Sequence, residues 1–263
     1  WERFSYYGMR GILMLYLTKT WLEGGLAFDP STASLIYGFA TGLTYFTPLI
    51  GGWIADNFLG QRKSVLLGGF IMFLGEAALF AWTSHAGLYL GLFLLIIGNG
   101  FFKPNISALV GGLYESGDKR LDSAFSIFYM GINLGAFLAP LITGLLTDNI
   151  FAKTAIDANT GEVAMSFGYK FGFGAAAIGM LIGELIFIFF AQKYLGDLGL
   201  KAKGSSKKVV ELSEAEAHKP LTKEEKERIT VIFVYFFFAI FFFAGFEQAG
   251  SSLTLYTDSY INR

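Results

Sequence analysis

Seven ionisable side chains fall inside strongly apolar stretches of this 263-residue chain. They are Glu2, Arg3, Arg10, Glu76, Lys103, Glu184 and Glu247. A charged group costs roughly 2.5–3.5 kcal/mol or more at the centre of a membrane-spanning helix, unless it is paired or reached by water. Cations in such positions suit the anionic group of a solute, and a carboxyl group there suits proton binding and release. These residue types therefore indicate solute or proton handling inside a membrane.

The composition supports a membrane setting for these residues. Hydrophobic residues make up 54% of the chain and charged residues 16%, whereas soluble domains carry about a quarter charged residues. The absence of cysteine excludes a disulfide framework, a thiolate zinc site and a cysteine nucleophile. The two histidines, His85 and His218, are too few and too far apart for a histidine metal site. The net charge of −1 gives no indication of nucleic-acid binding.

Helices are the elements that must position these side chains. A bilayer core needs about 20 apolar residues per helix, and continuous apolar runs argue against a strand barrel. We predict spans near residues 2–22, 31–55, 64–84, 87–111, 123–147, 171–192 and 229–255. The expected fold class is therefore an all-α polytopic membrane protein. Glycines four residues apart predict close helix contacts at Gly38/Gly42, Gly131/Gly135 and Gly179/Gly183.

The polar stretch 193–228 divides the chain into a six-helix bundle over residues 1–192 and a seventh helix within residues 229–263. Thr222 and Glu225 have the spacing of a capping box, which predicts a helix start. Lys and Arg lie mostly in the loops on the side of residues 193–228, which makes that side cytoplasmic by the positive-inside rule. We therefore expect a cytoplasmic linker and a multi-pass protein of the cytoplasmic membrane.

The first predicted helix carries a polar face. Arg3, Tyr7 and Arg10 are spaced i, i+4 and i+7, which places them on one side of a helix, with Glu2 beside them. Glu2 and Arg3 could instead lie at the cytoplasmic boundary and extend to water. Arg10 lies two turns further in, where a role in lining a cavity is favoured.

Further polar groups in other helices support such a cavity. Lys103 precedes Pro104, which favours a helix kink, and a buried lysine changes its protonation more readily than an arginine. Tyr45 lies in the second helix, and Asn133 follows Tyr129 by one turn in the fifth. Lys103 could also be a lysine that extends to the inner membrane surface, and a structural role for the tyrosines remains open.

The remaining carboxyl groups differ in their sequence surroundings. Glu247 follows a long uncharged run, where a lone carboxyl group could bind and release a proton. Glu76 and Glu184 have no evident polar partner nearby in the sequence. We therefore leave Glu76 and Glu184 out of the mechanism and expect them at packed helix contacts.

Four stretches resemble the proton-coupled oligopeptide transporters, a branch of the major facilitator superfamily. Residues 1–10, Trp-Glu-Arg-Phe-Ser-Tyr-Tyr-Gly-Met-Arg, resemble the first-helix motif E-x-x-E-R-F-x-Y-Y-G of that family. The first Glu of the motif would lie two positions before Trp1. Residues 51–62, 128–135 and 246–252 also agree with the family, and the four matches occur in the same order.

The resemblance implies roles for the residues that match. Glu2 and Arg3 would couple to Lys103 through proton-dependent salt bridges, and Glu247 would be a protonation site. Arg10 and Lys103 would bind the peptide carboxylate. Tyr7, Tyr45 and Asn133 would hydrogen-bond the peptide backbone, and we place Tyr129 in the same substrate-binding set.

The resemblance also implies a proton-driven symporter of di- and tripeptides that uses protons as the coupling ion, without a cofactor or a metal. Family members have twelve core helices, so we expect this chain to be a fragment whose partners are the lipid bilayer and the C-terminal half of the same transporter. A related symporter of nitrate or another small anion is the alternative. An intramembrane hydrolase would need a nucleophile or metal motif, such as H-E-x-x-H or G-x-S-x-G, that the sequence lacks. A non-transporting receptor or half-bundle scaffold is the remaining class.

Overall fold

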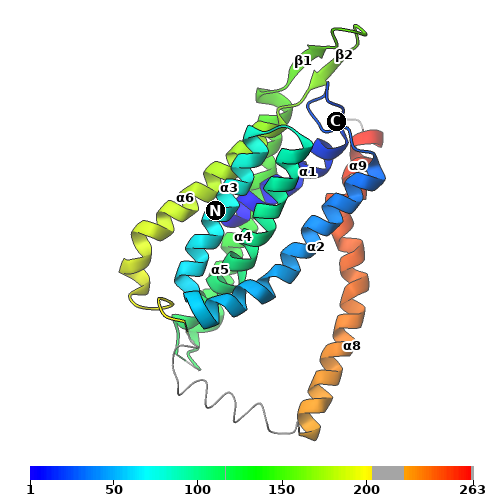
Figure 1. The fold of residues 1–263 in the computed structure, drawn as a ribbon. Helices are drawn as coiled ribbons and strands as arrows, with labels where there is room; N and C mark the ends of the chain where they lie inside the picture. The colour runs from blue at the N-terminus through cyan, green and yellow to red at the C-terminus, as the bar shows by residue number, and fades with distance from the viewer. Residues whose placement is uncertain (116, 203–221, 262–263) are drawn as a thin grey trace. The chain divides into compact units, whose positions relative to one another are not determined.

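The computed structural model describes residues 1–115, 117–202 and 222–261 (Figure 1). The chain divides into two compact units, Trp1–Ala202 and Lys203–Arg263, which are treated separately here. The first unit contains six α-helices, two π-helical turns and a β-hairpin among its described residues. In chain order these are α1 (Glu2–Thr18), α2 (Pro30–Ile54), η1 (Ala55–Leu59), α3 (Gln61–Ala81), α4 (His85–Gly112), α5 (Arg120–Gly144), η2 (Leu145–Ile150), β1 (Lys153–Ile156), β2 (Val163–Ser166) and α6 (Tyr169–Leu195).

The second unit contains α8 (Lys223–Phe246), η4 (Glu247–Gly250) and α9 (Ser252–Tyr260). The predicted capping box is present at its start. The Thr222 side chain accepts the backbone N–H of Glu225 at 3.2 Å, and the Glu225 carboxylate accepts the backbone N–H of Thr222 at 2.7 Å. The helix therefore begins six residues before the predicted apolar span, in a charged first turn. The predicted linker lies largely outside the described residues.

The all-α class is confirmed, since a helix occupies each of the seven predicted spans. Six helical stretches in the described part of the chain are long and apolar enough to cross a membrane. They are Pro30–Leu59, Gln61–Ala81, His85–Gly112, Arg120–Ile150, Tyr169–Leu195 and Lys223–Tyr260. The first helix, α1, has 17 residues and is the shortest of the seven.

A two-stranded hairpin between η2 and α6 was not predicted. Strands β1 and β2 pair antiparallel from Lys153 opposite Ser166 to Ile156 opposite Val163. At the tip, the Asp157 carboxylate accepts the backbone N–H groups of Asn159 and Thr160, and these hydrogen bonds lower the pKa of Asp157. The sequence signal was weak because each strand has only four residues.

Close helix contacts in the first unit depend on glycine. A Cβ atom built on Gly98 of α4 would lie 2.6 Å from the carbonyl oxygen of Gly68 in α3, so these two backbones touch. The predicted pair Gly179/Gly183 is also a contact, because Cβ atoms there would lie 2.6 Å from Phe4 and 2.9 Å from Trp1. The glycines are what allow α3 to pack on α4, and α1 on α6.

The other two predicted glycine pairs differ from this. Gly135 lies against α1, where a Cβ atom would be 3.0 Å from the Phe4 nitrogen, but Gly131 has no atom within 4 Å of that position. Neither Gly38 nor Gly42 has such a neighbour, so the prediction of a close contact for that pair is wrong within this unit. Spacing alone did not distinguish a helix contact from an open helix face.

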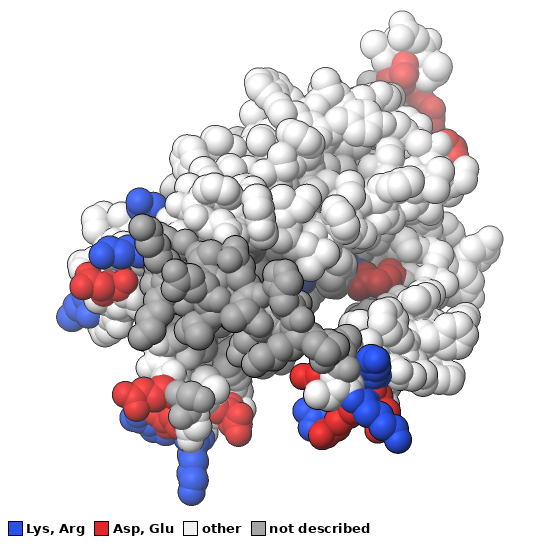
Figure 2. Space-filling model, turned by 60° about the horizontal axis from the view of Figure 1, so that its bottom comes forward, with Lys and Arg blue, Asp and Glu red and all other residues white. Residues whose placement is uncertain are grey.

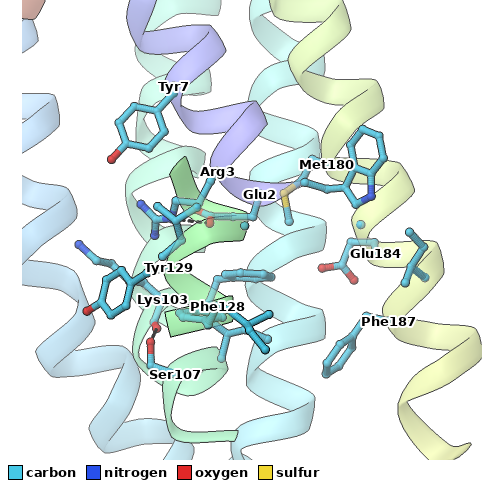
Figure 3. A pocket seen from close by; sticks show the side chains of 18 of the residues that line it. Glu2, Arg3, Tyr7, Lys103, Ser107, Phe128, Tyr129, Met180, Glu184 and Phe187 are labelled. Atoms are coloured by element: carbon cyan, nitrogen blue, oxygen red, sulfur yellow. Dashed lines mark hydrogen bonds and ion pairs between the residues drawn. The ribbon is translucent and has the colours of Figure 1, made fainter. Parts of the chain in front are cut away.

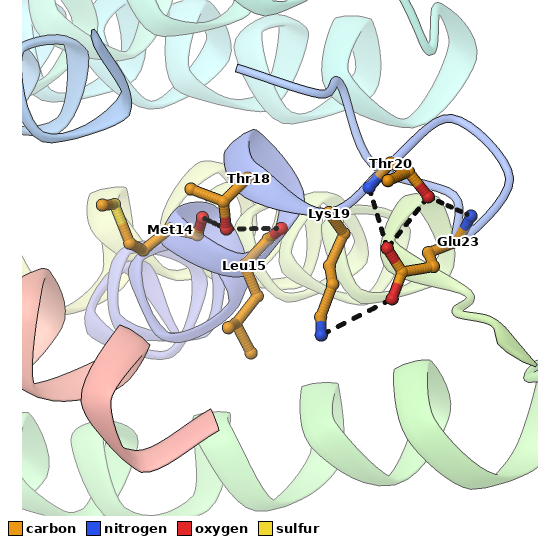
Figure 4. Close-up of polar contacts among 6 residues, drawn as sticks. All are labelled: Met14, Leu15, Thr18, Lys19, Thr20 and Glu23. Carbon is orange, nitrogen blue, oxygen red and sulfur yellow. Dashed lines mark hydrogen bonds and ion pairs between the residues drawn. The ribbon is translucent and has the colours of Figure 1, made fainter. Parts of the chain in front are cut away.

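Local polar contacts fix the turn between α1 and α2 (Figure 4). The Glu23 carboxylate accepts from the backbone and the hydroxyl of Thr20 at 3.0 and 2.9 Å, and Lys19 Nζ lies 3.6 Å from Glu23 Oε1. Asp29 then caps α2 by accepting the backbone N–H groups of Ser31 and Thr32. The turn therefore ends α1 and starts α2 within a short polar segment.

Charged side chains are concentrated at helix ends and loops. Figure 2 shows lysine, arginine and acidic side chains gathered in the foreground, while the surface behind them is almost free of charge up to the acidic loop of the hairpin. At the start of α3, the backbone N–H of Arg62 donates to the Gly199 carbonyl at 2.9 Å, and its guanidinium donates to the Gly196 carbonyl at 2.8 Å. These bonds attach the segment after α6 to α3.

Candidate functional site

The first unit holds a pocket of about 590 Å³ between α1, α2, α4, α5 and α6. Six of the predicted site residues line it, and Figure 3 shows the labelled ones around the same space. They are Glu2, Arg3, Tyr7, Tyr45, Lys103 and Tyr129. Three of these residues come from α1, and one each from α2, α4 and α5, so residues far apart in the sequence line one pocket.

An ion pair forms the part of the wall that α1 provides. Arg3 Nε lies 2.8 Å from Glu2 Oε2, and the Arg3 guanidinium lies 5.7 Å from the centre of the Tyr6 ring. Glu2 is buried, and its Oε1 has no hydrogen-bond partner. Because the two side chains form an ion pair, a change of charge at either residue would change the net charge that faces the pocket.

A lysine on an aromatic face forms the part that α4 provides. Lys103 Nζ lies 4.3 Å from the centre of the Tyr45 ring, which is a cation–π distance. Pro104 lies inside α4, and Asn105 donates from its side chain to the Phe101 carbonyl at 2.7 Å. The Ser107 hydroxyl donates to the Lys103 carbonyl at 3.3 Å. The Lys103 ammonium group thus faces the pocket, and Asn105 and Ser107 make side-chain hydrogen bonds to the α4 backbone beside it.

Three predicted site residues do not line this pocket. Arg10 lines a separate cavity of about 20 Å³, where its Nε donates to the Tyr37 hydroxyl at 2.5 Å. Asn133 is exposed on α5, one turn beyond Tyr129. Glu247 belongs to the second unit, at the start of η4. Helical spacing placed Arg10 on the face of Arg3 and Tyr7, but the smaller cavity and Tyr37 lie further along that face.

Sequence reasoning left out one residue that lines the pocket, Glu184 of α6. It lies with Met180 and Phe187 on the side opposite Lys103 in the view of Figure 3. The available signal was its charge within an apolar span. The second residue left out, Glu76 of α3, is fully buried and accepts from the Ser5 hydroxyl at 3.4 Å.

The donor set of the pocket suits an anionic or zwitterionic solute. Two cations, Arg3 and Lys103, line it together with phenol groups. In the described part of the chain, no three His, Cys, Asp or Glu side chains group in a way that could hold a metal ion. The chemistry available is therefore charge pairing, hydrogen bonding and proton exchange.

Comparisons with known proteins identify the family. Residues 62–197, more than half of the chain, match the POT family. The chain is 31% identical to the peptide transporter YePEPT of Yersinia enterocolitica, over all of this chain and 59% of that protein. It is 38% identical to a di-/tripeptide transporter of Lactococcus lactis, over 76% of this chain and 37% of that protein. The chain thus spans roughly two to three fifths of the length of these relatives.

Solved structures agree with the sequence matches. A crystal structure of the peptide transporter POT, an E310Q mutant in complex with sulfate, aligns with a TM-score of 0.69 and 36% identity. The alignment covers 93% of this chain and 43% of that one. A helical bundle with this similarity in sequence and structure excludes the hydrolase hypothesis. The chain belongs to the POT family of peptide transporters in the major facilitator superfamily, and it forms part of a multi-pass membrane protein and not of an enzyme.

Proposed function

We propose that the full-length protein carries di- and tripeptides across the cytoplasmic membrane together with protons, by alternating access. The observation that carries this proposal is the pocket in which the Glu2–Arg3 ion pair and Lys103 face one space of about 590 Å³. Two cations and one titratable carboxyl group provide both a peptide-carboxylate site and a proton site. The names of the relatives from Lactococcus and Yersinia support a peptide as the solute.

In this proposal Glu2, Arg3 and Lys103 couple proton binding to peptide binding. Protonation of Glu2 would weaken its pairing with Arg3, and a cation released from its partner can then attract the peptide carboxylate. Glu247 of the second unit would be the further protonation site of the cycle. The support for Glu247 is its acidic side chain directly after a long uncharged stretch of α8, residues 229–246.

The peptide itself would contact cations and hydrogen-bonding groups. Lys103 and Arg10 are proposed for its carboxylate, and four polar side chains for its backbone, namely Tyr7, Tyr45, Tyr129 and Asn133. Four of these six line the pocket. Arg10 and Asn133 lie outside its lining, so their participation requires that the cavity extend along α1 and α5 during the transport cycle.

The test is uptake of a labelled dipeptide by the full-length protein in proteoliposomes. With an inward proton gradient, Lys103→Ala and Glu247→Gln are expected to lose gradient-driven accumulation. Lys170→Ala is the matched control, because Lys170 is an exposed lysine at the start of α6. Undiminished accumulation in both variants would contradict the coupling scheme.

Competition distinguishes the proposed solute from its alternative. Arg3 and Lys103 would also suit nitrate or another small anion, since a cation pair attracts any anionic group. Excess unlabelled dipeptide is expected to block uptake of the labelled one, and nitrate is expected to have no effect. Inhibition by nitrate alone would replace the peptide with a small inorganic anion as the solute.

A further inference from the structure

The Glu184 carboxyl group occupies a space on α3 that exists because residue 69 is glycine. A Cβ atom built on Gly69 would lie 1.4 Å from Glu184 Oε1, and 2.9 Å from Met180 Cε. A side chain at position 69 would therefore take the place of the carboxyl group. We call this space the Gly69 notch. Since Glu184 also lines the pocket, one carboxyl group lies between the pocket and the contact of α3 with α6.

The carboxyl group of Glu184 lacks a polar partner in the notch. The side chain is 6% exposed, and its Oε1 is buried without a hydrogen-bond donor. Among the described residues, no ion pair or hydrogen bond joins Glu184 to a cation. A carboxylate ion held in this way has lost hydration without gaining a countercharge, which is costly. Binding one proton removes that charge.

Among the described residues, no helix next to Glu184 supplies a cation that neutralises it. The ionisable groups that line the pocket with Glu184 are Glu2, Arg3 and Tyr7 on α1, Tyr45 on α2, Lys103 on α4 and Tyr129 on α5, and α3 carries the buried Glu76. Arg3 pairs with Glu2, and Lys103 lies against Tyr45 on the far side of the pocket (Figure 3). None of them supplies an ion pair to Glu184 among the contacts of the described residues.

We propose that Glu184 is a second proton-binding site of the first unit, loaded from the pocket and separate from the Glu2, Arg3 and Lys103 group. A proton can bind at Oε1, whereas a larger cation cannot reach that atom because it is enclosed in the Gly69 notch. The proton occupies the contact between α3 and α6. Its loss would drive the carboxylate out of the notch towards the pocket, so the site links the charge of the pocket to helix packing.

The proposal adds a proton site to the pocket of the proposed function, but its test needs no transport. Infrared difference spectra of the purified full-length protein, recorded between neutral and alkaline pH, report carboxyl groups that still hold a proton when water-exposed carboxyl groups are already ionised. We expect a carboxylic-acid carbonyl band that disappears as the pH rises. Glu184→Gln is expected to remove this band. Glu76→Gln is the matched control and is expected to keep it, because Glu76 is buried on α3 and does not line the pocket.

A second pair of variants tests the notch without changing the carboxyl group. Gly69→Ala is expected to push Glu184 into the pocket, where water reaches it, and to move the titration of the band to lower pH. Gly38→Ala is expected to leave the titration unchanged, since no atom lies within 4 Å of that position. A titrating band that persists in Glu184→Gln, that is lost only in Glu76→Gln, or that is absent from the wild-type protein would overturn the proposal. Dipeptide uptake by the wild-type protein, measured in parallel, tests the proposed function independently.

Discussion

Two regions of the first unit, the pocket wall formed by α1 and α4 and the packed region of α3 and α6, hold their charged residues in different ways. On the side of α1 and α4, Arg3 has an acidic partner at 2.8 Å and Lys103 lies 4.3 Å from an aromatic ring. On the side of α3 and α6, Glu76 and Glu184 are 0% and 6% exposed, and each has one carboxyl oxygen without a hydrogen-bond partner. A carboxyl group can be stored in an apolar contact because a proton neutralises it. An arginine keeps its charge and needs a partner or water.

Helix packing explains which side can hold which group. Helix α3 packs against both α4 and α6, with glycines at the closest approaches, so carboxyl groups there lie between backbones. Helix α5 has only Ala139 and Thr143 buried among its described residues. Helix α5 nevertheless forms part of the pocket wall, through residues such as Phe128 and Tyr129.

The largest expected effect comes from placing a cation in the region of α3 and α6, where the carboxyl groups of Glu76 and Glu184 are buried. Glu76→Lys puts an ammonium group at a fully buried position, where the Ser5 hydroxyl donates to Glu76 at 3.4 Å. We expect a loss of about 3 kcal/mol or more in the free energy of unfolding, measured by thermal unfolding in detergent. Glu76→Gln keeps the shape of the side chain and introduces no charge, so we expect it to lower the free energy of unfolding much less. Equal stability of the lysine and glutamine variants would show that this side tolerates a charge.

The next largest effect concerns the close backbone contact between α3 and α4. Gly98→Leu places its Cβ 2.5 Å from Met72 and 2.6 Å from the Gly68 carbonyl oxygen. Overpacking of this kind typically costs about 1–3 kcal/mol, so the unfolding temperature should fall. Gly38→Leu serves as the control, because no atom is near that Cβ position. If both leucine variants unfold at the wild-type temperature, the α3–α4 contact is looser than described.

A smaller effect is expected on the cationic side. Tyr45→Leu removes the ring that faces Lys103 at 4.3 Å, and a cation–π contact at an exposed site contributes about 0.5–1 kcal/mol. We therefore expect dipeptide binding to weaken about two- to fivefold, measured by calorimetric titration of the full-length protein. Tyr45→Phe keeps the ring face and removes only the hydroxyl group proposed for the peptide backbone, so it should weaken binding less than Tyr45→Leu. Weakening of the same size in the phenylalanine variant would assign the effect to the hydroxyl group instead.

The smallest effect is expected from Asp29, an acidic group exposed to water, in contrast to the buried Glu76 and Glu184. Hydrogen bonds from Ser31 and Thr32 hold the pKa of Asp29 well below its usual range. Because the folded-state pKa is depressed, its contribution to stability is complete above the unfolded pKa of about 3.9 and is lost as the pH falls through the folded value. Asp29→Asn should therefore unfold at a slightly lower temperature than wild type at neutral pH. The difference should vanish in strong acid; a difference that persists there would show that charge is not the cause.

Much of the helical framework could be predicted from local patterns. Apolar runs located all seven helices, and Thr222 with Glu225 marked the start of α8. Predicted ends differed from the observed ones by up to several residues, because end turns depend on caps and on backbone contacts. The hairpin after η2 was missed, since its pairing of Lys153 with Ser166 joins short strands that have little apolar alternation.

The sequence indicated which residues could belong to the site, but not which of them lie next to one another. Charge within apolar runs selected Glu2, Arg3 and Lys103, which share the pocket. The same criterion could not show that Arg10 donates to Tyr37, or that Glu184 lines the pocket against Gly69. Those facts depend on how each helix is rotated about its axis and on partner residues that lie 27 positions away for Arg10 and more than a hundred for Glu184.

By itself, the sequence determined the membrane class, the approximate positions of seven long helices and the set of ionisable groups that need special surroundings, because hydropathy and charge are properties of local segments. The tertiary structure alone decided which of those groups face one pocket and which carboxyl groups are enclosed between helices. The reason is that a glycine such as Gly69 creates space only when another helix, here α6, lies against it.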